Sequence, residues 1–221
     1  MNRNQTIFII NDDEDALEST AALVDSMGAE IYCFDSAERF VEAYSGQRPA
    51  CIVTDQRMPG MSGIELLELL RSRGITVSVV MMTAFPDTRS TVRAVRGGAL
   101  TLIEKPCNSQ ELWNEIQEGL KQDAVNYTDE VKVSNAKTRV ASLTKRERDA
   151  MMLLVKGNAN KVIASRLDVS LRTIESRRAS ILRKLDGGSV AEVVQTWLLA
   201  GEKGVDDSSD DLEPDGTPDQ K

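Results

Sequence analysis

Five short apolar runs recur along residues 1–122 and constrain the fold more than any other feature of the chain. The runs are nearly continuous rather than alternating, as expected of strands that are covered on both faces. They are Thr6–Ile10, Ile31–Phe34, Cys51–Thr54, Val77–Met82 and Leu100–Ile103. Helical segments separate the runs, so the alternation predicts an α/β fold with a five-stranded, doubly wound parallel sheet.

Cap and stop residues predict where several of these helices begin and end. A helix over Ala16–Met27 is expected to stop at Gly28. Ser62 with Glu65 forms a capping box, and Asn108 with Glu111 forms a second N-cap pattern. Pro86 suits the first turn of another helix, which is expected to end near Gly97 and Gly98.

The net charge of −8 is unevenly distributed. Residues 1–122 carry −7, residues 123–142 are neutral, residues 143–200 carry +5 and residues 201–221 carry −6. The pattern predicts an acidic domain, a linker, a small basic domain and an acidic tail. The tail has one Val and one Leu, too few to bury a core, so we expect it to be disordered.

The composition also excludes several classes of protein. The chain has no histidine, which excludes a histidine general base, a Ser-His triad and a histidine-ligated metal. Its three cysteines, Cys33, Cys51 and Cys107, have no CxxC spacing and are expected to be reduced core thiols. No apolar run approaches the ~18–20 residues of a membrane span. We therefore expect a cytoplasmic protein.

Polar residues follow four of the predicted strands. Asn11 and Asp12 come after the first strand, Asp55 after the third, Thr83 after the fourth and Lys105 after the fifth. In a 2-1-3-4-5 strand order the carboxyl ends of strands one and three meet at the topological switch point. Two carboxylates there repel one another unless a cation intervenes, and without histidine the natural candidate is Mg²⁺. Lys105 and Thr83 then suit a phosphoryl group.

Four segments, IFIINDD, IVTDQRMPGMSG, VVMMTA and LIEKP, together resemble the signature segments of two-component receiver domains, which have a flavodoxin-like fold. The resemblance covers residues 5–120. It implies that Asp55 accepts a phosphoryl group from the histidine of a sensor kinase, and that Thr83 and Lys105 bind the phosphoryl oxygens. It further implies that Mg²⁺ is held by Asp12, Asp55 and the main-chain carbonyl of Arg57, and that the Lys105–Pro106 peptide is cis.

The chain departs from the receiver pattern at two positions. Asn11 stands where the family usually has an acid, so an oxygen ligand is kept but a charge is lost, and we expect weaker Mg²⁺ binding. Leu102 stands where the family has an aromatic residue that moves inward together with the Thr83 position. The resemblance therefore makes Thr83 and Leu102 the switch pair, with altered switching.

Residues 143–200 read as four short helices. They are expected over Lys145–Lys156, Lys161–Leu167, Leu171–Leu185 and Ala191–Leu199, with Ser170 and Ser189 as N-caps. A short helix followed by a longer basic helix predicts a small all-α helix-turn-helix domain whose second helix enters the major groove of DNA.

The segment LTKRERDAMMLLVKGNANKVIASRLDVSLRTIESRRASILRKL resembles the LuxR-type helix-turn-helix of the NarL/FixJ class. The resemblance places a set of polar residues on or near the DNA: Lys161, Arg172, Thr173, Glu175, Arg177, Arg178 and Lys184. For Glu175 a structural pairing within the module is an equal alternative. Arg177 stands where the family often has histidine, and Arg183 is more simply a solvated residue.

The resemblances together identify a two-component response regulator, with a receiver at 1–122, a linker at 123–142, a DNA-binding domain at 143–200 and a tail at 201–221. They imply a sensor histidine kinase and duplex DNA as partners, a homodimer on phosphorylation, and no enzyme activity beyond the receiver's own phosphotransfer and slow autodephosphorylation. From charge alone, the acidic tail could compete with DNA for the basic helix.

Two alternatives come from other classes. A haloacid-dehalogenase-type hydrolase needs an acid two residues after its nucleophile, where this chain has Arg57. A receiver-based signalling protein could instead bind protein or RNA through its second domain.

Overall fold

The computed structural model describes residues 5–25 and 28–202, and the chain divides into two compact units, Met1–Asp129 and Glu130–Lys221. Each unit has its own hydrophobic core. The predicted acidic tail, apart from Gly201 and Glu202, and the predicted helix end at Met27 lie outside the described residues.

The first unit is built on a five-stranded parallel sheet in the order β2-β1-β3-β4-β5, as predicted. The strands are β1 (Thr6–Ile10), β2 (Glu30–Phe34), β3 (Ala50–Asp55), β4 (Ser78–Thr83) and β5 (Thr101–Glu104). In the register, Ile10 lies opposite Phe34 on one side and Thr54 on the other. The carboxyl ends of β1 and β3 therefore lie side by side, as the switch-point argument requires.

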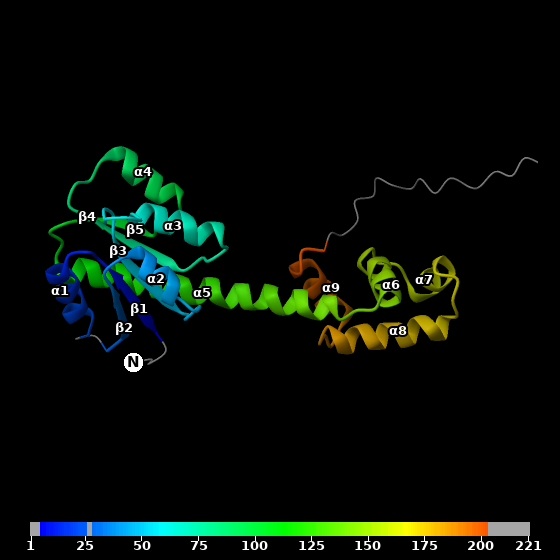
Figure 1. Cartoon of the computed structure of the whole chain (residues 1–221). Coiled ribbons are helices and arrows are strands. Elements are labelled where there is room, and N and C mark those ends of the chain that lie inside the picture. Colours follow the sequence, from blue (N-terminus) through cyan, green and yellow to red (C-terminus); the bar gives the residue numbers. More distant parts are fainter. Residues whose placement is uncertain (1–4, 26–27, 203–221) are drawn as a thin grey trace, which may run out of the picture. The chain divides into compact units, whose positions relative to one another are not determined.

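Helices cover both faces of this sheet (Figure 1). On one face, side chains of α2 (Ala37–Ala43), α3 (Gly63–Ser72) and α4 (Thr88–Arg96) pack in one core cluster. On the other face, α1 (Glu14–Asp25) and the first part of α5 (Ser109–Ala141) pack in a second cluster. Double coverage explains why the inner strands β1, β3 and β4 are buried and largely apolar without alternation.

The predicted caps are formed. Ser62 and Glu65 make a reciprocal capping box at α3, and the Asn108 side chain accepts the Glu111 N–H at 2.8 Å. The helix α4 begins later than expected, because Asp87 is its N-cap and Pro86 lies before it. Of the cysteines, Cys51 is buried, but Cys33 is exposed on β2 and Cys107 is half-buried, so the expectation of three core thiols was wrong for these two.

The stretch 123–142 was expected to be a linker, helical at most at its start, but it is helical through Ala141. The helix α5 continues without a break through residues 123–141, with Asp129 in the first unit and Glu130 in the second. No glycine or proline occurs between Leu120 and Ala141, so nothing in the sequence interrupts the helix. Asp123, which is fully buried, anchors this region of α5 to the first unit.

The second unit is all-α. It contains the end of α5 and the helices α6 (Lys145–Val155), α7 (Asn160–Arg166), α8 (Leu171–Lys184) and α9 (Val190–Leu199). Their apolar faces meet in one core around Trp197, Met151 and Ile181. No helix in residues 5–25 or 28–202 is long and apolar enough to cross a membrane.

Candidate functional site

The acidic residue predicted to be reactive lies at the carboxyl end of the sheet. Asp55 ends β3, and Lys105 follows β5, so the topology brings both to the same edge. The Lys105 amine pairs with one Asp55 carboxylate oxygen, and the Arg57 N–H donates to the other at 2.9 Å. The Asp55 side chain is 12% exposed, so its carboxylate is held in place yet remains accessible.

A cavity of about 270 Å³ opens beside this pair. The carboxylate-bearing loop after β1 lines one side of it, with Asn11, Asp12 and Asp13. Thr83 and Lys105 line it as well. The structure thus brings together every residue that the sequence placed at this site except Leu102.

Asn11 is buried, and its side-chain oxygen already has a partner. Its side-chain Oδ1 accepts the Asp13 N–H at 3.1 Å, and its main-chain N–H donates to the Phe34 carbonyl at 3.1 Å. Asn11 therefore shapes the β1–α1 loop that carries Asp12, in addition to lining the cavity.

The predicted switch residues lie on adjacent strands. Thr83, at the end of β4, is 1% exposed, and its hydroxyl accepts the Phe85 N–H at 3.2 Å. Leu102 lies on β5 and packs against the core cluster on the α4 side of the sheet, outside the cavity. The Lys105–Pro106 peptide is cis.

The oxygens at this edge fit Mg²⁺. Asp12, Asp55 and the carbonyl of Arg57 are hard donors, and Mg²⁺ usually keeps several waters and takes only one or two carboxylates from the protein. In the described part of the chain, no three His, Cys, Asp or Glu side chains converge as a ready-made metal cage.

Two glycines allow the loop after Asp55 to approach the site closely. A Cβ on Gly63 would lie 2.3 Å from the Asp55 carbonyl oxygen, so no other residue fits there. Gly60 has a φ of +74°, and a Cβ on it would lie 2.6 Å from Glu38 Oε1. Glu38 accepts the Met61 N–H at 2.7 Å and so ties this loop to α2.

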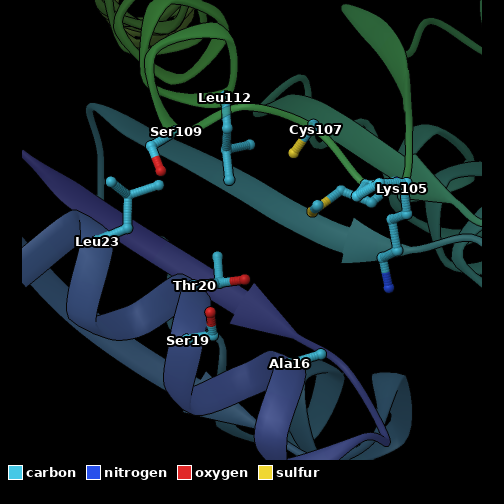
Figure 2. Close-up of a pocket in the computed structure, with 10 residues that line it drawn as sticks. Ala16, Ser19, Thr20, Leu23, Lys105, Cys107, Ser109 and Leu112 are labelled. Atoms are coloured by element: carbon cyan, nitrogen blue, oxygen red, sulfur yellow. The ribbon is translucent and has the colours of Figure 1, made fainter.

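A second cavity, of about 470 Å³, lies between α1 and the start of α5 (Figure 2). Thr20 and Leu23 of α1 face Ser109 and Leu112 across it. Lys105 lines both cavities, because it sits where the loop after β5 passes between them.

In the second unit, α7 and α8 form the predicted helix-turn-helix. The turn between them contains Asp168 at a φ of +48°, and Ser170 caps α8 by accepting the Thr173 N–H at 3.1 Å. The buried face of α8 carries Ile174 and Ile181. The opposite side is exposed and basic.

The structure divides the predicted DNA-facing residues into two groups. Exposed or half-buried side chains without a partner among the described residues are Lys161, Arg172, Glu175 and Arg177. The others are engaged within the unit: Arg178 donates to the Asn160 side chain at 3.1 Å, Thr173 contacts the Ser170 hydroxyl at 2.8 Å, and Lys184 pairs with Glu147 at 2.7 Å. Within the part of the chain that the structure describes, Glu175 does not make the structural pairing that was its alternative role.

The Glu147 carboxylate joins α6 to α8. It caps α6 through Thr144 and accepts hydrogen bonds from Ser180 at 2.6 Å and Lys184 at 2.7 Å. Burial opposes its ionisation, but the hydrogen bonds from Lys184, Ser180 and Thr144 prevail and lower its pKa to about 2. This carboxylate is therefore charged at any physiological pH.

Two small residues of α8 lie on the exposed surface of this helix but were not among the predicted DNA-facing residues. Ser176 and Ala179 are exposed on α8 between Arg172 and Arg183. The spacing of 4, 3 and 4 residues places all four on one side of the helix, opposite Ile174 and Ile181. Helical periodicity would have found this stripe, whose small members let the helix backbone approach a surface closely.

The family models match both units. Residues 7–117 match the response regulator receiver domain, and residues 141–197 match the luxR family of bacterial regulatory proteins. The transcriptional regulatory protein FixJ of Azorhizobium caulinodans is 37% identical over 92% of this chain and 96% of its own length. The response regulator protein TodT of Pseudomonas putida is 31% identical over 87% of this chain and 85% of its own length.

Two solved structures are similar over both units. The response regulator StyR has a TM-score of 0.79 and 35% identity, covering 87% of this chain and 98% of StyR. Full-length FixJ from B. japonicum has a TM-score of 0.54 and 35% identity, covering 90% of this chain and 98% of that one.

Proposed function

The chain belongs to the two-component response regulators of the NarL/FixJ class, transcriptional regulators that join a receiver domain to a LuxR-type DNA-binding domain, and from this premise we propose that phosphorylation of Asp55 controls the affinity of the chain for DNA. The observation that carries the proposal is the Asp55 carboxylate, held by Lys105 at the edge of a cavity that Asp12 and Thr83 also line. We assign residues 1–122 to the receiver, 123–142 to the connecting segment, 143–200 to DNA binding and 201–221 to the tail.

The proposed reaction is a phosphoryl transfer to a carboxylate. An Asp55 oxygen forms a bond to phosphorus while the bond from phosphorus to the nitrogen of the kinase's phosphohistidine breaks. Lys105, already paired with Asp55, stays in position to pair with a phosphoryl oxygen. Bound Mg²⁺ would supply positive charge that offsets the charge on the transferring group. The receiver thus catalyses its own phosphotransfer and a slow autodephosphorylation, without acting on other substrates.

Thr83 and Leu102 carry the response in this proposal. The Thr83 hydroxyl lies at the end of β4. It can turn to donate its proton to a phosphoryl oxygen while still accepting the Phe85 N–H. Leu102 packs beneath α4, where a shift of the loop after β4 alters the face formed by α4, β5 and α5. That face then pairs with a second copy, so that a dimer binds two half-sites on the duplex.

The DNA contacts are assigned to α7 and α8. Lys161, Arg172 and Arg177 reach phosphates or bases, and Glu175 with Thr173 faces the base edges near the start of α8. Arg178 adds positive charge to this surface while it donates to Asn160. Lys184 lies near the same surface, but Glu147 offsets its charge. A sensor histidine kinase and duplex DNA are thus the partners, which places the protein in the cytoplasm.

The test compares wild type with Asp55→Asn after treatment with acetyl phosphate and Mg²⁺. We expect one added phosphoryl group by intact mass in wild type and none in the variant, with a shift toward dimer by light scattering and tighter binding to duplex DNA in wild type only. Asp25→Asn, which removes an exposed acid at the end of α1 outside the cavity, is the control and should still be labelled.

Equal labelling of wild type and Asp55→Asn would refute the proposed acceptor. Labelling without duplex binding at any salt concentration would instead favour a second unit that binds protein or RNA.

A further inference from the structure

In the described part of the second unit, some basic side chains form ion pairs and others do not. Arg139, Arg148 and Lys184 form ion pairs with Asp186, Glu202 and Glu147, respectively. The remaining basic residues of α7 and α8, apart from Arg178, have no ion-pair partner among the described residues; we call them the open basic set, and they are Lys161, Arg166, Arg172, Arg177 and Arg183. Five cations concentrated on two adjacent short helices attract any polyanion within reach.

The chain itself carries a polyanion that starts at a fixed point on this unit. Glu202, the last described residue, pairs with Arg148. The Arg148 guanidinium also lies 5.4 Å from the centre of the Trp197 ring and donates to the Val140 carbonyl at 3.3 Å. Three separate contacts thus fix Arg148, and the pair with Glu202 holds the last described residue against α6.

The segment 203–221 has the charge and the length to reach the open basic set. It carries seven acids and two lysines in 19 residues, and both family models end before it. Fully extended, such a length of chain spans up to ~60 Å. A compact unit of this size has a radius of gyration of about 11 Å, so every surface of it lies within reach.

We propose that the acidic segment 203–221 binds the open basic set of its own chain and competes there with duplex DNA. The proposal rests on the proposed DNA-binding function of the same helices. Because the segment is tethered through Glu202, its effective concentration at α7 and α8 is of millimolar order, so even weak contacts compete. DNA must displace the segment before it can bind.

The competition has a recognisable salt dependence. Binding of DNA releases counterions from the duplex, but displacement of the acidic segment makes the basic side chains and the freed acids take up ions again. With the segment intact, affinity therefore falls less steeply with salt than it does without it. At high salt the segment no longer binds, and the two curves converge.

The experiment uses the full-length chain and a variant of equal length whose segment is neutral: Asp206, Asp207, Asp210, Asp211, Asp215 and Asp219→Asn with Glu213→Gln. Binding to a fluorescein-labelled duplex of mixed sequence is followed by anisotropy over a salt series. We expect the neutral variant to bind about three- to tenfold more tightly at low salt, with a steeper salt dependence and convergence at high salt. Equal affinity at every salt concentration overturns the proposal.

A second readout does not involve DNA. A carbodiimide joins carboxylates to amines in direct contact, and peptide mass spectrometry identifies the residues joined. We expect Lys161 to be joined to acids of 203–221, and the exposed Lys145, at the start of α6, to serve as the comparison within the same unit. Links made mainly to Lys145 or to receiver lysines overturn the proposal. Links to Lys161 together with no duplex binding by either chain refute the DNA-binding function while leaving the contact itself established.

Discussion

The two ends of the receiver sheet each bring acids and bases together, but different groups satisfy the charges at each end. At the carboxyl end, Asp12, Asp13 and Asp55 face a cavity with Lys105 as the nearby amine. At the amino end, Asp123 is fully buried and Arg48 nearly so, with 2.7 Å between the Arg48 Nε and the Asp123 carboxylate.

The difference lies in what satisfies each charge. Asp123 also accepts the N–H groups of Ala50 at 2.7 Å and Ser78 at 3.3 Å, at the starts of β3 and β4. Burial raises the pKa of Asp123, and these bonds together with Arg48 oppose that rise. Nearby, Arg71 is engaged by the carbonyls of Ile75, Val77 and Gly98. At the amino end the buried Asp123 carboxylate is thus satisfied by protein donors, although a cavity of about 340 Å³ lined by Arg71 and Ser78 opens there as well. The carboxyl end keeps an excess of acid that a cation and a phosphoryl group can use.

The largest effect is expected from removing the buried Asp123 carboxylate at the amino end of the sheet. Asp123→Ala leaves Arg48 buried without its carboxylate and two strand N–H groups without an acceptor, which should cost about 3–5 kcal/mol of stability. Urea unfolding followed by Trp113 fluorescence in a Trp197→Phe background measures it. Asp25→Ala, at an exposed position at the end of α1, is the control and should change little. A loss below 1 kcal/mol for Asp123→Ala would mean that the contacts of Asp123 with Arg48, Ala50 and Ser78 do not secure α5.

The second unit extends the comparison, because Glu147 is another carboxylate closed in by protein donors. Its pKa falls from 4.5 to about 2 on folding, so its contribution is fully present above pH 4.5 and is lost as the pH falls toward 2. The shift corresponds to about 3 kcal/mol. Urea unfolding at pH 5 and pH 3, followed by Trp197 fluorescence in a Trp113→Phe background, should show a loss of about 2 kcal/mol, because the rest of the contribution is lost below pH 3. Glu147→Gln should lose less stability over the same pH interval; parallel losses would contradict the assignment.

Substitutions at the carboxyl end of the sheet should change the affinity for a ligand rather than the stability of the fold. Asn11→Asp adds a charge to the cavity and should tighten Mg²⁺ binding by about tenfold, measured by titration calorimetry. The comparison variant is Asp13→Asn, which removes a charge from the same cavity and should weaken binding. If Asn11→Asp left Mg²⁺ affinity unchanged, the bond from Asp13 N–H to residue 11 would be its whole role.

The smallest effect is expected from an ion pair in neither cluster. Arg93 and Glu68 form two hydrogen bonds of 2.7 Å across α4 and α3, but both side chains are about half exposed. Solvent screens such a pair, so Arg93→Ala should cost less than about 1 kcal/mol in the same urea assay. A cost approaching that of Asp123→Ala would show that burial does not separate the two kinds of pair.

Much of the fold and of the candidate site was readable in the sequence. Continuous apolar strands predicted the doubly covered sheet, and the strand order then placed Asp12, Asp55, Thr83 and Lys105 at one edge. Local signals such as the Ser62–Glu65 capping box also held, because they involve residues only three apart. The continuous α5 was missed, since weak apolar patterning suggested a linker although nothing in the stretch breaks a helix.

What the sequence by itself determined, then, was the order of elements and the residues at their ends, since periodicity, caps and strand-end chemistry are local properties. Only the tertiary structure decided which charges are closed in. The Arg48–Asp123 contact joins residues 75 apart, and the Lys184–Glu147 contact joins residues 37 apart. Whether a charged side chain is a ligand site or an internal tie depends on the donors that folding brings around it, and those donors come from distant parts of the chain.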